Sequence, residues 1–140
     1  MVYLNDGRFL RFAMSLYLEP YGRETRLKVE KSVIQYQIDE DGDRWIFRYD
    51  YLRHATEPHP GAHLQIRGAL SESSVVPLRE TLERVHFPTG RVSLEAIIRL
   101  LVEQFGLRTN EDPALWRPVL AASEEEFLRI AHQSVSGPRA

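Results

Sequence analysis

The most restrictive feature of this chain is a long stretch near its start in which apolar and polar residues alternate. Within residues 9–18 every second side chain is apolar: Leu10, Phe12, Met14, Leu16 and Leu18. Successive side chains of a β-strand point to opposite faces, so this period of two predicts a strand with one buried face. Such a strand needs further strands to pair with it.

Three more stretches predict those strands and order them as an antiparallel meander. Residues 25–38 alternate, but the apolar positions change from odd to even near Lys31, which predicts a β-bulge there. Asp41-Gly42 predicts a hairpin into the strand 44–52, and a fourth strand follows at about 63–70. The acidic run 39–43 has the wrong spacing for a calcium loop, because its glycine comes too early.

The second half of the chain predicts helices. Leu94, Ile97, Ile98, Leu101 and Phe105 recur at helical spacing over 93–105, with Ser93 as N-cap and Gly106 as stop. Asp112-Pro113 predicts a short helical turn, and Ser123 begins a capping box for a last helix. Residues 75–86 fit either a short helix or a strand.

These elements predict an α+β fold: an antiparallel meander sheet of four or five strands, with two or three C-terminal helices packed on one face. At 140 residues we expect one domain over 1–140, with the sheet at about 9–70 and the helical part at about 75–134.

Composition narrows the classes of function. The chain has no cysteine, which excludes disulfides and thiolate metal sites, and its formal net charge of −2 argues against a globally basic nucleic-acid binder. No apolar run approaches the ~20 residues that span a bilayer, and the N-terminus lacks a signal-peptide pattern. We therefore expect a cytoplasmic protein with no membrane partner.

The densest group of chemically useful side chains lies between the last two predicted strands. His54, His59 and His63 fall within ten residues, and Arg48 and Asp50 precede them on one face of the strand 44–52. Histidine is the side chain most often used for proton transfer near neutral pH. If these two strands pair as a hairpin, Asp50, His54 and His63 come together at the strand ends.

Three interpretations of this group stay open. In the first, His63 with His54 or His59 performs acid–base cleavage of a phosphodiester, assisted by Arg48 or Arg67, and His86 could join. In the second, His59, His63 and Asp50 hold a metal ion. In the third, the residues are structural. The catalytic set that we carry forward is His63, His59, His54, Asp50 and Arg48, with no metal or cofactor.

The aromatic residues also allow two interpretations. Tyr36, Trp45, Phe47 and Tyr49 have the periodicity of a core face, which favours packing across strands. Tyr36, Trp45, Tyr49 and Tyr51 could instead stack bases on an exposed sheet face beside arginines. We expect core packing.

Between Val33 and about Phe105 the chain resembles the small TumE-like proteins, toxin components of bacterial toxin–antitoxin modules. The matching features are Arg48-Tyr49-Asp50, His54, Pro58-His59 with His63, and Pro88-Thr89 before the helix at 93. The loop before His63 is longer here than the compact form of that family. The resemblance implies a protein that inhibits bacterial growth, is neutralised by an antitoxin protein and acts on RNA.

A non-catalytic interaction module is the alternative function. The ordinary core pattern and the absence of a strong catalytic motif support it. This alternative predicts an exposed sheet edge or an apolar patch that binds a second copy of the chain or another protein.

Overall fold

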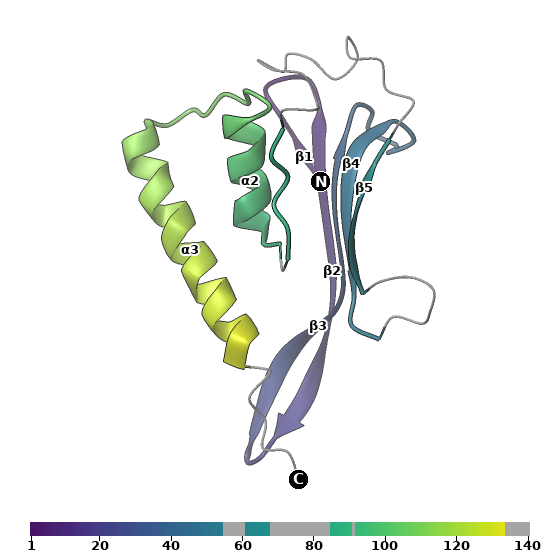
Figure 1. Ribbon diagram of the computed structural model, residues 1–140, viewed down its shortest axis with the longest axis vertical. Helices are drawn as coiled ribbons and strands as arrows, with labels where there is room; N and C mark the ends of the chain where they lie inside the picture. The colour runs from purple at the N-terminus through teal and green to yellow at the C-terminus, as the bar shows by residue number, and fades with distance from the viewer. Residues whose placement is uncertain (55–60, 68–84, 91, 134–140) are drawn as a thin grey trace. The chain divides into compact units, whose positions relative to one another are not determined.

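A computed structural model describes residues 1–54, 61–67, 85–90 and 92–133 of the chain. The chain forms two compact units, Met1–Val76 and Pro77–Ala140. The first unit contains the sheet and the second contains the helices (Figure 1). A single domain with helices packed on the sheet stays a prediction.

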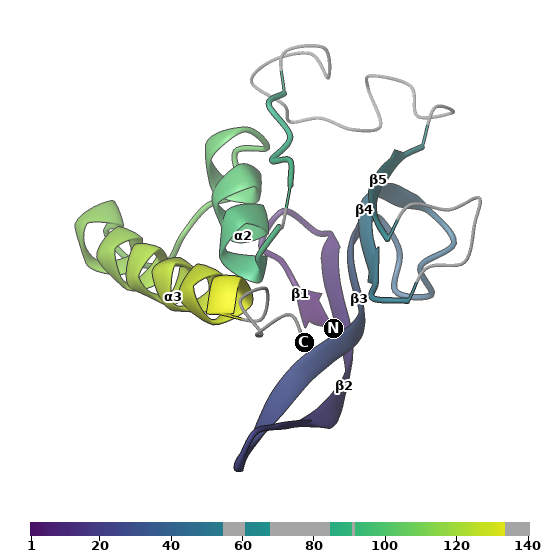
Figure 2. The same cartoon turned by 60° about the horizontal axis from the view of Figure 1, so that its bottom comes forward.

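The sheet is an antiparallel meander, as the alternation predicted. Its five strands lie in chain order: β1 (Val2–Tyr3), β2 (Phe9–Tyr21), β3 (Glu24–Gln37), β4 (Trp45–Leu52) and β5 (Ala62–Ile66). The longest pairing joins β2 and β3, whereas β4 pairs with β3 only from Lys31 to Gln37. The distal half of the β2–β3 hairpin therefore extends beyond β4 as a twisted two-stranded ribbon (Figures 1 and 2).

Two irregularities set which side chains share a face. Ser15 pairs with Lys31 and Leu16 with Val29, so Glu30 is the extra residue of a bulge on β3, close to where the change of parity predicted it. A second irregularity lies where Tyr36 pairs with Phe47 and Gln37 with Trp45. It removes Trp45 from the face that carries Phe47.

The predicted aromatic core is wrong for one residue, Trp45. The guanidinium carbon of Arg48 lies 5.5 Å from the centroid of the Trp45 ring, and the indole is half-buried. The other aromatic residues of that set, Tyr36, Phe47 and Tyr49, are buried as predicted. Their rings pack in series: the Phe47 centroid lies 5.5 Å from that of Tyr36 and 6.0 Å from that of Tyr49.

The turn between β3 and β4 is fixed by its own side chains. Asp39 Oδ1 accepts hydrogen bonds from Gly42 N (2.9 Å) and Arg44 N (3.2 Å). Buried Gln37 donates from Nε2 to Asp39 O (2.7 Å), and Gln35 donates to Gly42 O (3.3 Å). These bonds make the acidic run a structural turn, as the hairpin interpretation predicted.

Replacing Gly42 with alanine is expected to lower the free energy of unfolding by about 1–2 kcal/mol. Gly42 has φ +87°, and an added Cβ would lie 3.1 Å from Gln35 Nε2. Urea denaturation measures the change. Gly22→Ala is the matched control, because Gly22 has φ +62° but open space around it, so its loss should be smaller. Equal losses would show that the glutamine contact has no effect.

The second unit contains two helices that lie side by side, α2 (Leu94–Glu103) and α3 (Pro113–Gln133). Ser93 caps α2 as predicted: its hydroxyl accepts from Ala96 N at 3.0 Å. Arg99 of α2 forms an ion pair with Glu124 of α3, and Ser93 Oγ donates to the same carboxylate (3.2 Å). These bonds tie the N-cap and the middle of α2 to the middle of α3.

The predicted break before Ser123 is wrong. Residues 113–133 form one continuous helix, and the Ser123 hydroxyl donates to Glu95 Oε1 of α2 (2.6 Å). Pro118 lies inside this helix, and the four residues between it and Ser123 are apolar and include no further helix breaker, so the helix continues through the expected cap. The part of the chain that the structure describes includes no helix long and apolar enough to cross a membrane.

Candidate functional site

The sheet brings together two members of the predicted catalytic set. Asp50 of β4 lies directly opposite His63 of β5 in the antiparallel register. Residues directly opposite each other share a face of the sheet, and His63 Nε2 lies 3.7 Å from Asp50 Oδ2. The hairpin expected from the sequence therefore forms, and it pairs this carboxylate with this imidazole.

Arg48 completes the group from two residues earlier on the same strand. Its Nε donates to Asp50 Oδ2 at 2.7 Å, and its Nη2 donates to Gln65 Oε1 at 2.7 Å. Gln65 is the cross-strand partner of Arg48 on β5. We call Arg48, Asp50, His63 and Gln65 the polar cluster. Two of the five guanidinium N–H groups make these bonds, so Arg48 retains donors for an anionic ligand.

The polar cluster is partly desolvated but accessible. The exposed fractions of its side chains are 33% for Arg48, 29% for His63 and 18% for Asp50. An ion pair at this depth is screened less than one on the open surface. The arrangement can therefore position an imidazole with a carboxylate and bind an anion beside it.

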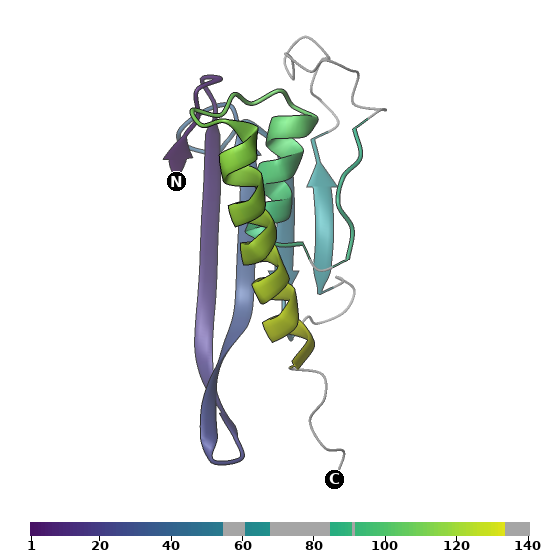
Figure 3. The same ribbon diagram turned by 90° about the vertical axis from the view of Figure 1, so that its left-hand side faces the viewer.

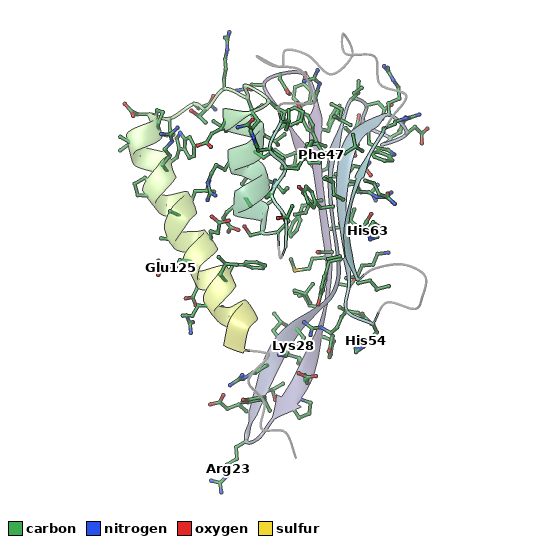
Figure 4. The ribbon with its side chains drawn as sticks, in the orientation of Figure 1. Arg23, Lys28, Phe47, His54, His63 and Glu125 are labelled. Carbon is green, nitrogen blue, oxygen red and sulfur yellow. The ribbon has the colours of Figure 1, made fainter. Side chains whose placement is uncertain are left out.

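Of the other residues predicted for the site, those that the structure describes lie outside the polar cluster. His54 is exposed just past the end of β4, and Figure 4 shows it well away from His63 along the sheet. His59 lies outside the described residues. Arg67, the alternative arginine, binds the backbone carbonyl of Asp43. His86 is exposed and belongs to the second unit.

Sequence reasoning missed one neighbour of Arg48, Gln65, and expected the other, Trp45, to pack in the core, with base stacking beside arginines as the alternative. Gln65 could have been found by continuing the antiparallel register from the Asp50–His63 pair to the next pair on the same face, Arg48–Gln65. Trp45 could not, because the bulge that turns it toward Arg48 leaves no mark in the alternation. Within the described residues no group of three or more histidine, aspartate or glutamate side chains could hold a metal ion.

A second polar group, also missed, lies at the first turn of the chain. The Tyr36 hydroxyl donates to Asp6 Oδ2 (2.5 Å) and accepts from Arg8 Nη1 (3.0 Å). Arg8 N also donates to Asp6 Oδ1 (3.0 Å), which closes the turn between β1 and β2. Tyr36 is fully buried, so this group fixes the turn against the sheet and has a structural role.

The buried tyrosines predict a loss of stability at high pH. Burial raises the pKa of Tyr49 from its ordinary value of 10 to about 12, and burial followed by the bond to Asp6 raises the pKa of Tyr36. The unfolded chain therefore releases these protons first, so the free energy of unfolding should fall between pH 10 and 12. Urea denaturation across this range should show a shallower fall for Tyr49→Phe. An unchanged slope would contradict this prediction.

Comparison with protein-family models found no match, and comparisons with curated proteins and with solved structures found none either. The function must therefore be argued from the geometry of the chain itself.

Proposed function

We propose that the polar cluster is a metal-independent acid–base site that cleaves RNA. The observation that carries this proposal is that one carboxylate oxygen, Asp50 Oδ2, is shared by Arg48 Nε at 2.7 Å and His63 Nε2 at 3.7 Å. A carboxylate this close to an imidazole stabilises the positive charge that the ring acquires when it takes a proton, as general acid–base catalysis requires. The guanidinium supplies positive charge where a phosphate would bind.

The proposed reaction uses the ribose as nucleophile. His63, whose Nε2 lies 3.7 Å from Asp50 Oδ2, takes the proton of a ribose 2′-hydroxyl. The 2′-oxygen attacks the adjacent phosphorus, the bond from phosphorus to the 5′-oxygen breaks, and water protonates that 5′-oxygen. Arg48 stabilises the negative charge that develops on the phosphoryl oxygens. The products are a 2′,3′-cyclic phosphate and a 5′-hydroxyl end.

Trp45 gives the site a surface for a base. Its ring lies on the Arg48 side of β4 with the guanidinium carbon 5.5 Å from its centroid, and it is half-buried. Stacking on an aromatic ring contributes about 1–3 kcal/mol per base and tolerates any sequence. We therefore expect single-stranded RNA to be the preferred substrate.

Incubating the purified chain with single-stranded RNA in EDTA tests the proposal. We expect fragments from the wild type and a loss of activity of about 100-fold or more for His63→Ala. His86→Ala is the matched control, because it removes another histidine outside the polar cluster and should cleave normally. Intact RNA with the wild type, or equal cleavage by His63→Ala, would overturn the proposal.

The motifs between Val33 and about Phe105 that resemble those of TumE-like proteins suggest a biological setting for this proposed activity, although no family model matches the chain. We propose that the chain acts in the bacterial cytoplasm as the toxin of a toxin–antitoxin module, with an antitoxin protein as its partner. Inducing the wild-type chain in a bacterial host should then arrest growth, and inducing His63→Ala should not. Normal growth with the wild type would contradict this setting.

A further inference from the structure

We infer that two copies of this chain join along the outer edge of β2 to form a continuous antiparallel sheet. Only Phe9 and Leu10 of β2 are paired with β1, so no described strand pairs with that edge beyond Leu10. Figure 3 shows β2 as the outermost long strand, with β1 beside one end of it. This inference does not depend on the polar cluster or on RNA cleavage.

The backbone of this edge is available for pairing. Leu52 N donates to Gly61 O toward β5, whereas Arg53 N donates to Glu30 O toward β3. N–H groups of successive residues therefore point alternately to the two neighbouring strands. Following this alternation through the β4–β3 and β3–β2 pairs shows that the N–H groups of even-numbered β2 residues point away from β3, toward the free edge. Pro20 agrees with this assignment. It is an even-numbered residue that pairs with Thr25, and its missing N–H costs the β2–β3 ladder no hydrogen bond because that position points to the free edge. The edge open to a partner therefore runs over residues 11–19.

The ends of that edge select one register. Antiparallel pairing of residues 11–19 with the same residues of a second copy places the two-fold axis at Ser15. Arg11 then lies opposite the partner's Glu19, and Glu19, which also pairs with Lys28 of its own chain at 3.6 Å, lies opposite the partner's Arg11. The apolar residues also meet: Phe12 faces the partner's Leu18 and Met14 faces the partner's Leu16. Pairing the whole free edge of one copy with the whole free edge of the other requires this register. The same register places opposite charges opposite each other and apolar side chains opposite apolar side chains.

The exposed side chains give a reason for the pairing. Phe12, Met14, Leu16 and Leu18 are 38%, 41%, 47% and 67% exposed on one face of β2. The distal half of the hairpin is a two-stranded ribbon, and two strands alone are marginally stable in water. A second copy would add strands beside this ribbon and cover part of the apolar row.

A charge-reversal experiment on the full chain tests both the dimer and its register. Light scattering should give the wild type twice the 16.3 kDa mass of one chain. Arg11→Glu and Glu19→Arg should each raise the dimer dissociation constant by on the order of 10- to 100-fold, because like charges meet at both ends of the edge. Mixing the two variants should restore a dimer, since each reversed charge then faces its opposite.

Arg23→Glu is the matched control, because Arg23 lies in the hairpin turn outside the paired residues and its reversal should leave the dimer unchanged. Circular dichroism checks that each variant retains the sheet. A monomeric wild type, or a dimer that Arg11→Glu does not weaken, would overturn the inference. Two weakened variants that do not restore each other would overturn the register centred on Ser15.

Discussion

Replacing Arg48 with alanine is expected to lower the rate of the proposed RNA cleavage by about 100- to 1,000-fold, the usual cost of removing one group that stabilises transition-state charge. The substitution removes the donor that binds Asp50 Oδ2 at 2.7 Å and the cation proposed to bind phosphate. Arg48→Lys should recover little of the rate, because an ammonium group cannot bond Asp50, Gln65 and a phosphate with one planar fork. Initial rates on a labelled single-stranded RNA measure both variants.

Arg44→Ala separates this effect from a general loss of positive charge. Arg44 is exposed in the turn before β4, and its hydrogen bonds come from its backbone: its N–H donates to Asp39 Oδ1 and its carbonyl accepts from Ile38 N. Its removal should leave the cleavage rate within about twofold of the wild type, as expected for a charge that touches neither substrate nor site. If Arg44→Ala and Arg48→Ala slowed cleavage equally, the arginine would act only through the overall field of the protein.

Replacing Phe47 with alanine is expected to lower the free energy of unfolding by about 3–5 kcal/mol. Phe47 is fully buried, and its ring lies between those of Tyr36 and Tyr49. The loss combines the transfer of an aromatic side chain to water with the cavity that remains. Since a domain is typically stable by about 5–15 kcal/mol, the variant should begin to unfold at far lower urea concentrations.

Ile66→Ala is the matched control for Phe47. Ile66 pairs with Phe47 across β4 and β5 but is 45% exposed, so its truncation should cost only about 1 kcal/mol. Urea denaturation followed by circular dichroism compares the two variants on the same sheet. Equal losses for both would contradict a core centred on the Tyr36, Phe47 and Tyr49 rings.

The fold could be predicted from the sequence because its strands carry one consistent signal. Period-two alternation identified β2, β3 and β4, and the change of parity near Lys31 located the bulge at Glu30. Asp41-Gly42 identified the turn between β3 and β4, where Gly42 takes φ +87°. Each of these signals is local, so each can be recognised from neighbouring residues alone.

Features that depend on pairing between strands could not be predicted in the same way. Trp45 has the parity of the core face, but the irregular pairing of Gln37 with Trp45 moves it off that face. Ser123 has the sequence of a helix cap, yet its hydroxyl donates to Glu95 on a neighbouring helix. The bond from Tyr36 to Asp6 joins residues 30 positions apart, which no local pattern encodes.

The candidate site likewise has residues that the sequence predicts and an arrangement that depends on pairing between strands. The sequence supplied Arg48, Asp50 and His63 as candidates, and the hairpin between β4 and β5 was expected to bring the carboxylate and the imidazole together. Their opposition depends on a strand register that the loop length alone does not define. For the same reason His54, close to Asp50 in sequence, lies past the end of β4 and away from His63 (Figure 4).

The most direct test of the central claim, that His63 activates a ribose hydroxyl, is the cleavage of a DNA oligonucleotide with a single ribonucleotide, measured in EDTA. The account predicts one cut, after that ribonucleotide, with a 2′,3′-cyclic phosphate on the product, and a rate that His63→Ala lowers by about 100-fold or more. Cleavage of the all-deoxy oligonucleotide at the same rate, or an undiminished rate with His63→Ala, would contradict it.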